Sequence, residues 1–362
     1  MYFQKISIKN IIKSIYKRFN LLNIIVASFV PKKNFYPMVF YGGLRSGNIG
    51  GPLVKIKKLK KYFPEYKFRF NLVYTTSSNS FLTKSSIKYL KKKNYPIILN
   101  QNGVFYPAWF GENYKQKNQL NQYLYHKADY VFWQSRFSKN ASEKYLGERL
   151  GSGEILYNAI DTEIFKPSRR TKTNFSFLIT GNISKNNNYR IISVLEALME
   201  VLKYDSKVCL IIAGNIIDKT FFVSESQRLG IIENVNFLDK FKQENAPEIY
   251  QMADAYITMS YQDNCPSAVL EAMSCGLPIL YSASGGVPEL VDEFSGIGLK
   301  VASSWQNIQI PDRKAISEGM IKIIENRKNM SISSRMRAVE KFDIKYWHKR
   351  HKYIFDYFLG KQ

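Results

Sequence analysis

The stretch DNCPSAVLEAMSCGLPILYSASGGVPE, residues 263–289, decides the fold of this chain. The run before it, AYITMS at 255–260, is short and apolar and ends in polar residues, as a buried parallel strand does at its carboxyl end. Pro266 suits the first position of a following helix, with Cys265 as its N-cap. Strand, loop and helix patterns alternate along the chain, which predicts an α/β fold with parallel sheets in two domains.

The start of this helix predicts an anion site. The N–H groups of Ser267 and Ala268 have no partner inside the helix and point outward. Because the helix dipole adds positive potential there, a pyrophosphate is the natural ligand. Glu271 lies one turn further along, where its carboxylate can accept hydrogen bonds from a ribose diol, and Asp263 precedes it in the loop. We therefore expect a nucleotide-sugar site.

The spacing of Asp263 and Glu271, followed by Gly-Leu-Pro and by Gly-Gly-Val-Pro-Glu, resembles a family signature. It is similar to that of the retaining GT-B glycosyltransferases, specifically glycosyltransferase family 4, whose usual form has Glu in both acidic places. The resemblance implies that Asp263 contacts the donor sugar or its developing charge and that Glu271 holds the ribose. It also implies that the backbone of Gly285 and Gly286 helps to position the sugar.

The residues that would neutralise the donor phosphates come from 175–202, which has a strand, loop and helix pattern. The family commonly has Gly-Arg after this strand and a Lys a few residues later. Gly181 is kept, but Asn182 stands where the Arg is expected. We expect Lys185 to contact the phosphates, with Arg190 as a replacement for the missing guanidinium.

Two further segments define the domains. YNAIDTEIFKP at 157–167 resembles the segment that ends the first domain, and 342–358 resembles the terminal helix that crosses back to it. The resemblance implies a GT-B fold, in which two Rossmann-like parallel-sheet domains face a cleft. We predict a basic amphipathic segment at 1–33, an acceptor-side domain at 34–165, a nucleotide-sugar donor domain at 166–341 and a crossing-back helix at 342–362.

The first domain carries weaker signals. A glycine-rich turn lies between a strand and a helix that begins near Pro52, and its spacing fits neither the Rossmann nor the Walker pattern. The resemblance implies that this loop approaches the donor phosphate and the acceptor. Asn102 follows another strand, in a region where family members often carry a His that touches the sugar. The acceptor or phosphate loop is predicted from three residues: Gly47, Gly50 and Gly51.

The charge of the chain is uneven. The net charge is +24, and residues 1–100 contain 20 Lys or Arg against one acid, Glu65. Residues 1–33 hold seven basic residues and no acid. One helical face would carry Lys9, Lys13 and Lys17, and another would carry Ile8, Ile11, Ile12, Ile15 and Phe19. Such a segment can lie in an anionic membrane interface. A core-packed helix and a signal or anchor remain open alternatives, although the apolar run 21–30 is about half the ~20 residues that a spanning helix needs.

The remaining composition bears on metals and location. Three cysteines without metal-ligand spacing indicate a reducing cytoplasm. An Asp-x-Asp motif is missing from the sequence, so we predict no metal site and no cofactor, with cations and helix termini neutralising the diphosphate.

The predicted function is transfer of a hexose-type sugar, with retention, to a glycan or lipid-linked acceptor. We place it in bacterial cell-surface polysaccharide or lipopolysaccharide synthesis, in the cytoplasm and peripheral on the inner face of the membrane. A catalytically inactive GT-B protein that binds nucleotide-sugars is the main alternative, and a GT-B epimerase is another. A nucleic-acid partner would explain the charge, but no RNA- or DNA-binding module is recognisable, so we expect none.

Overall fold

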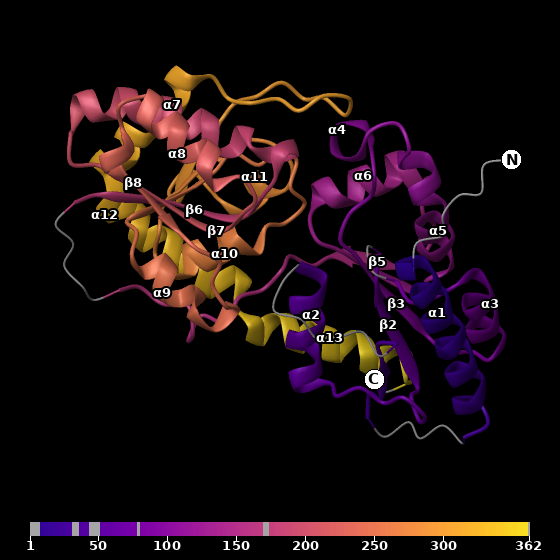
Figure 1. Ribbon diagram of the computed structural model, residues 1–362. Helices are drawn as coiled ribbons and strands as arrows, with labels where there is room; N and C mark the ends of the chain where they lie inside the picture. Colours follow the sequence, from indigo (N-terminus) through magenta and orange to yellow (C-terminus); the bar gives the residue numbers. More distant parts are fainter. Residues whose placement is uncertain (1–7, 31–35, 43–50, 78–79, 169–173, 361–362) are drawn as a thin grey trace, which may run out of the picture. The chain divides into compact units, whose positions relative to one another are not determined.

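The computed structural model describes residues 8–30, 36–42, 51–77, 80–168 and 174–360. The chain forms two compact units, the first comprising Met1–Leu156 with His348–Gln362 and the second Tyr157–Trp347. The chain therefore passes between the units after Leu156, before the predicted boundary at residue 165. Figure 1 shows a sheet with surrounding helices in each unit.

The first unit is built on five parallel strands that follow one another in sequence order. The strands are β1 (Val39–Phe40), β2 (Leu72–Thr76), β3 (Ile97–Gln101), β4 (Tyr130–Trp133) and β5 (Gly153–Ile155). The helices are α1 (Ile8–Ala27), α2 (Gly51–Tyr62), α3 (Lys84–Lys92), α4 (Pro107–Phe110), α5 (Tyr114–Lys127) and α6 (Arg136–Leu146). Every residue of β2, β3 and β4 is buried, as expected of strands covered on both faces.

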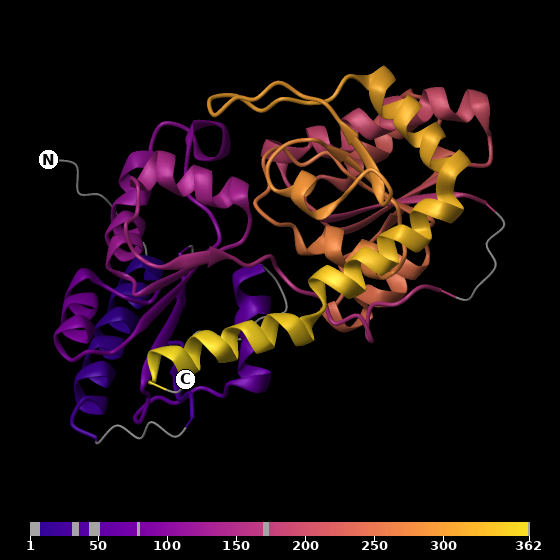
Figure 2. The same ribbon diagram turned by 180° about the vertical axis from the view of Figure 1, so that it is seen from behind.

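The last helix of the chain, α13 (Ile344–Phe358), completes the first unit. Its His351 Nε2 lies 3.2 Å from the Tyr74 hydroxyl on β2, and Phe355 packs edge-on against Phe63 and Tyr74. Figures 1 and 2 show the sheet between this helix and α3. The terminal helix therefore returns to the first unit, as the resemblance implied. None of the helices in the described ranges combines the length and apolar character of a membrane span.

The second unit contains six parallel strands in the order β8-β7-β6-β9-β10-β11. They are β6 (Ser176–Ile183), β7 (Cys209–Ile216), β8 (Val235–Leu238), β9 (Ala255–Thr258), β10 (Ile279–Ser282) and β11 (Gly296–Leu299). The chain fills one half of the sheet outward from β6 and then returns to start the other half at β9. This is the Rossmann strand order, in which ligands bind at the carboxyl ends of the strands where the order reverses.

Helices cover both faces of the second sheet. They are α7 (Tyr189–Tyr204), α8 (Lys219–Arg228), α9 (Ala246–Gln251), α10 (Ser267–Ser274), α11 (Val287–Leu290) and α12 (Arg313–Phe342), with short 3-10 turns η1 (Lys185–Asn187), η2 (Ile232–Asn234) and η3 (Gln243–Asn245). Successive side chains of a strand point to opposite faces. Accordingly, Phe177 and Ile179 of β6 join the core under α7, whereas Leu178 joins the core under α10. The two cores explain why the strands are continuous apolar runs.

The helical end of the chain is interrupted at Asp343, where the sequence predicted one helix from 342 onward. Asp343 has an extended backbone, and its carboxylate accepts hydrogen bonds from the Thr162 hydroxyl and from the Lys345 amide at 2.8 Å. The backbone of Ile160 pairs with Phe342 and Ile344 on either side of it, each N to O distance being 2.9 Å. This pairing ends α12 and lets α13 start in a new direction.

Candidate functional site

The predicted donor residues gather at the carboxyl ends of β6 and β9, where the strand order reverses. Helix α10 begins at Ser267, so Pro266 is its N-cap and the predicted cap, Cys265, is wrong. The reason lies in the Cys265 carbonyl, which accepts a 2.6 Å hydrogen bond from Asn158 Nδ2 instead of from a helix amide. The helix instead starts with the Pro266 carbonyl, which accepts from the Val269 amide at 3.2 Å.

Two consequences follow for the loop before α10. Ser267 and Ala268 are still the first two helix residues, and their amides have no acceptor one turn back, as predicted. Asn158 also donates its backbone amide to Cys265 Sγ at 3.3 Å. Asp161 holds the turn that follows Asn158, because its carboxylate accepts from the amides of the second and third residues after it. Asn158 therefore positions the loop that leads into the anion-binding end of α10.

Glu271 lies on α10 with only 8% of its surface exposed. Gln243 Nε2 donates to its Oε1 at 3.0 Å, and the Tyr250 hydroxyl donates to its Oε2 at 2.8 Å. Burial and the Glu271 charge raise the pKa of Tyr250 well above its usual value, so this hydroxyl keeps its proton. The Thr180 hydroxyl lies 3.2 Å from the Tyr250 oxygen and 3.0 Å from that of Tyr256. A buried polar chain thus joins Glu271 to Thr180 of β6.

Asp263 lies in the loop between β9 and α10 and is half-buried. Its Oδ1 accepts the Cys265 amide at 3.2 Å, and burial raises its pKa while the charge of Arg190 opposes that shift. Its carbonyl accepts the Gly286 amide at 2.7 Å. Gly285 has a φ of +66°, and a Cβ there would lie 2.4 Å from the Asp263 carbonyl oxygen. The structure therefore brings Asp263 together with both predicted glycines.

The residue before Asp263 has a strained backbone. Gln262 has a φ of +54°, a left-handed conformation that costs a residue with a side chain about 1–3 kcal/mol. Its amide donates to the Ser284 hydroxyl at 3.0 Å, in the loop after β10. The β9 and β10 loops thus hold each other in one arrangement around Asp263.

Arg190 is a cation whose charge acts on Asp263. It lies in the first turn of α7, and its Nη2 is 3.8 Å from where a Gly181 Cβ would be. Its Nε is buried and has no hydrogen-bond partner among the residues that the structure describes. Lys185 is exposed on η1 and Asn182 is exposed at the end of β6. The geometry therefore favours Arg190 over Lys185, the cation that the sequence put first.

Of the candidates predicted in the first unit, Asn102 and Gly51 lie within the described residues. Asn102 follows β3, and the Ser77 hydroxyl donates to its Oδ1 at 2.9 Å and accepts its amide at 3.1 Å. Gly47 and Gly50 lie outside the described residues, and Gly51 is the first residue of α2. Sequence reasoning missed Lys55 of α2, which is buried and donates to Asn100 Oδ1 at 2.8 Å. In the sequence, Lys55 belongs to a run of lysines that is typical of a solvent-exposed helix face, so nothing marked it as buried.

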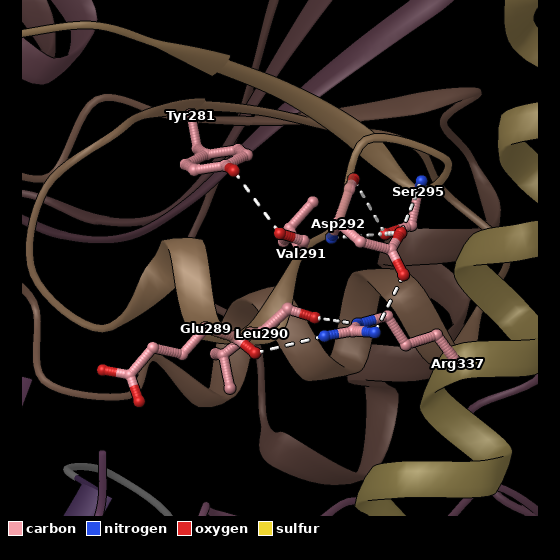
Figure 3. Close-up of polar contacts among 7 residues, drawn as sticks. All are labelled: Tyr281, Glu289, Leu290, Val291, Asp292, Ser295 and Arg337. Atoms are coloured by element: carbon pink, nitrogen blue, oxygen red, sulfur yellow. Dashed lines mark hydrogen bonds and ion pairs between the residues drawn. The ribbon is translucent and has the colours of Figure 1, made fainter. Parts of the chain in front are cut away.

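Arg337 of α12, which carries no sequence signal, holds the helix that follows the two glycines. Figure 3 shows its guanidinium against the end of α11, where it donates to the carbonyls of Leu290 at 2.5 Å and Glu289 at 3.2 Å. It also pairs with Asp292 at 2.8 Å, and the Asp292 carboxylate accepts the Ser295 amide and hydroxyl. These contacts satisfy carbonyls at the helix end that would otherwise lack partners.

A family model described as "Glycosyl transferases group 1" matches residues 160–340. The chain belongs to this family. The match covers the β6 to α11 segment and therefore every predicted donor-binding residue of the second unit. In the part of this group 1 glycosyltransferase that the structure describes, there is no group of three His, Cys, Asp or Glu side chains that could hold a metal ion.

Individual relatives are distant. The chain is 22% identical over 200 residues to N-acetyl-alpha-D-glucosaminyl L-malate synthase of Bacillus anthracis, covering 52% of this chain and 49% of the relative. Matches to such curated relatives span half of their length or less. Among solved structures, a glycosyltransferase from Rickettsia africae aligns with a TM-score of 0.66 at 14% identity over 96% of this chain and 95% of its own. HepE of Anabaena, in complex with UDP-glucose, aligns with a TM-score of 0.61 at 17% identity, over 87% and 85% of the chains. These similarities show the GT-B fold, with two Rossmann-like units.

Proposed function

We propose that this protein transfers a hexose-type sugar from a nucleoside-diphosphate sugar to a glycan or lipid-linked acceptor, with retention of configuration. The observation that carries the proposal is the convergence of Glu271, Arg190 and the first amides of α10, which have no acceptor within the helix, at the reversal of strand order. An anion-binding helix start, a cation and a buried carboxylate match the diphosphate and ribose of such a donor.

The residues take distinct roles in this proposal. The Ser267 and Ala268 amides and Arg190 bind the diphosphate, with Lys185 at its exposed side. Glu271 accepts hydrogen bonds from the ribose hydroxyls, for which the Gln243 amide at Oε1 must give way because Tyr250 occupies the deeper oxygen. Asp263 and the Gly285 and Gly286 backbone position the sugar, and Gly181 on β6 lies beside Arg190.

In the reaction, the bond between the anomeric carbon and the diphosphate oxygen breaks and a bond to the acceptor oxygen forms. The acceptor proton passes to the departing phosphate oxygen. Negative charge grows on the diphosphate, so donors that are already oriented toward it lower the barrier most. Arg190 and the α10 amides supply that stabilisation in our proposal without a metal ion or other cofactor. Asn102 of the first unit is proposed to contact the sugar, and the predicted glycine loop to approach the acceptor.

The setting that we propose is bacterial cell-surface polysaccharide synthesis, at the cytoplasmic face of the membrane. The +19 charge of residues 1–100 supports a partner surface of anionic lipid. The complexes of similar structures with UDP and UDP-glucose support testing uridine donors first.

The deciding experiment compares Glu271→Ala with the parent protein. A hydrogen bond to a buried carboxylate is worth about 1.5–3 kcal/mol, so affinity for the UDP-sugar should fall about 10- to 150-fold. Thermal-shift assays with different nucleotide-sugars identify the donor, because a ligand at 100 times its Kd adds ~2.7 kcal/mol of stability. Transfer of labelled sugar to lipid extract measures turnover.

The matched control is Glu248→Ala, which removes an exposed carboxylate from α9 and should change neither affinity nor turnover. Unchanged donor affinity in a folded Glu271→Ala protein contradicts the ribose assignment. Donor binding by the parent without hydrolysis or transfer of sugar would instead support an inactive GT-B binding protein. Asn182 supports that alternative, because it is exposed at the position where the family commonly has an Arg.

A further inference from the structure

Helix α1 carries an exposed apolar stripe that continues into the turn after it. Five large apolar side chains are between 55% and 77% exposed: Ile15, Phe19, Leu22, Val26 and Phe29. Their spacing of four, three, four and three residues places them along one face of a helix. Such a continuous apolar face is unusual on a protein surface unless something covers it.

The opposite side of α1 is fixed to the first unit. Ile24 and Ala27 are buried, and Asn23 Nδ2 donates to the Lys67 carbonyl at 3.2 Å. The hydroxyls of Ser28 and Tyr89 lie 2.7 Å apart and join the end of α1 to α3. Because the core contacts use this other side, the stripe is not the face that the fold itself buries.

Helix α3 lies beside α1 and supplies positive charge (Figures 1 and 2). Lys84, Lys88 and Lys92 are exposed at four-residue spacing, so they share one face of α3. Neither helix contains an acid, and the first acid of the chain is Glu65. An apolar strip next to a cationic helix is the pattern of a protein surface that lies in an anionic membrane interface.

We infer that the α1 stripe and the α3 lysines together form a docking surface for an anionic lipid bilayer. The stripe enters the boundary between headgroups and acyl chains, and the lysines contact lipid phosphates. Charge complementarity favours lipid over a second copy of this chain, which would present the same positive face. The inference rests on the proposed function only in its account of why the protein docks, which is to reach a lipid-linked acceptor.

Sedimentation with vesicles tests the surface without any donor or acceptor. Vesicles of phosphatidylcholine alone are compared with vesicles that also contain phosphatidylglycerol. Leu22→Ser/Val26→Ser/Phe29→Ser should lower partitioning to the anionic vesicles by about tenfold or more, since it removes most of the inserted apolar area. Lys84→Gln/Lys88→Gln/Lys92→Gln should lower it by a similar factor, and the parent should bind more weakly at 1 M salt.

The chain offers a matched control on α12 of the second unit. Ile332, Met336 and Val339 have the same spacing as Leu22, Val26 and Phe29 and are 37–55% exposed. Their triple replacement by Ser should leave vesicle binding unchanged. If it weakens binding as much as the α1 variant does, general hydrophobicity accounts for the binding and the inference fails.

The other outcomes are equally decisive. Full binding by the α1 variant, or equal binding of the parent to neutral and anionic vesicles, overturns the proposed surface. A parent that is dimeric by light scattering and ignores vesicles, together with a monomeric α1 variant, assigns the stripe to a second copy instead. Thermal shift with UDP on the same proteins reports the donor site separately, so failure of lipid binding and failure of the proposed function are distinguishable.

Discussion

The Tyr250 hydroxyl donates a 2.8 Å hydrogen bond to Glu271 Oε2 while both groups are buried. The other oxygen, Oε1, accepts a 3.0 Å hydrogen bond from Gln243, which is half-buried. Tyr250 therefore acts as a positioning residue that sets the direction of the carboxylate.

Tyr250→Phe should weaken binding of the nucleotide about tenfold, because Glu271 loses the donor that orients it and one of its buried oxygens loses a partner. Isothermal titration with UDP and with uridine measures the change. Tyr256→Phe is the control, since Tyr256 is equally buried and its hydroxyl bonds to Thr180. Equal losses in the two variants would show that core packing, not carboxylate orientation, is responsible.

Arg190→Ala should weaken binding of UDP by about 10- to 150-fold and binding of uridine much less, because only UDP carries the phosphate charge. Lys185→Ala should have the same preference with a smaller loss, since Lys185 is exposed. Competition binding with both ligands measures the two effects. Arg190 would be ruled out as the principal cation if the lysine variant lost more, or if uridine binding fell as far as UDP binding.

Asp263→Asn should stabilise the unliganded fold at neutral pH. Burial raises the pKa of Asp263, so its ionised form is less favourable in the folded state than in the unfolded chain. This destabilisation is absent at pH values below the pKa that Asp263 has in the unfolded chain, and it grows as the pH rises above that value. The Tm advantage of the variant should thus be larger at pH 7 than at pH 4, while sugar transfer falls.

Asn keeps the Oδ1 acceptor for the Cys265 amide, so the test isolates the charge. The same substitution at Asp239, whose side chain is 89% exposed, serves as the control and should leave Tm nearly unchanged at both pH values. A Tm advantage that does not vary with pH would contradict the role given to the Asp263 charge.

Arg337→Met should lower the free energy of unfolding by about 1–3 kcal/mol, because two carbonyls at the end of α11 lose their donor. Chemical denaturation measures this loss. Lys314→Met breaks the exposed pair with Glu318 on the same helix and should cost less, about 0–1 kcal/mol. Equal losses in the two variants would show that capping of α11 stabilises the fold no more than an exposed ion pair does.

The fold could be predicted well because its signals are local. The structure places β9 within the apolar run predicted to be a strand at 255–260, and β6 at the start of the strand, loop and helix pattern predicted over 175–202. The helix that carries Glu271 and the glycine turn were likewise visible as residue types at fixed spacing. Both features depend on backbone conformation, which neighbouring residues largely determine.

The parts that could not be predicted depend on contacts between distant residues. The polar partners of Glu271 come from η3 and α9, and nothing in the spacing of Gln243 or Tyr250 marks them. The displaced cap of α10 likewise follows from Asn158, more than a hundred residues earlier in the chain. In the first unit, the strands follow sequence order and lack the reversal seen in the second, which the glycine-rich turn did not reveal.

The close approach of Gly285 to Asp263 limits how this site can be altered by mutation. A methyl group at position 285 would overlap the Asp263 carbonyl and would force a left-handed backbone on a residue that avoids it. Saturation libraries aimed at a new sugar specificity should therefore leave position 285 constant. Position 182 is better suited to randomisation, because its side chain is exposed at the end of β6 and can change size and charge without moving either loop.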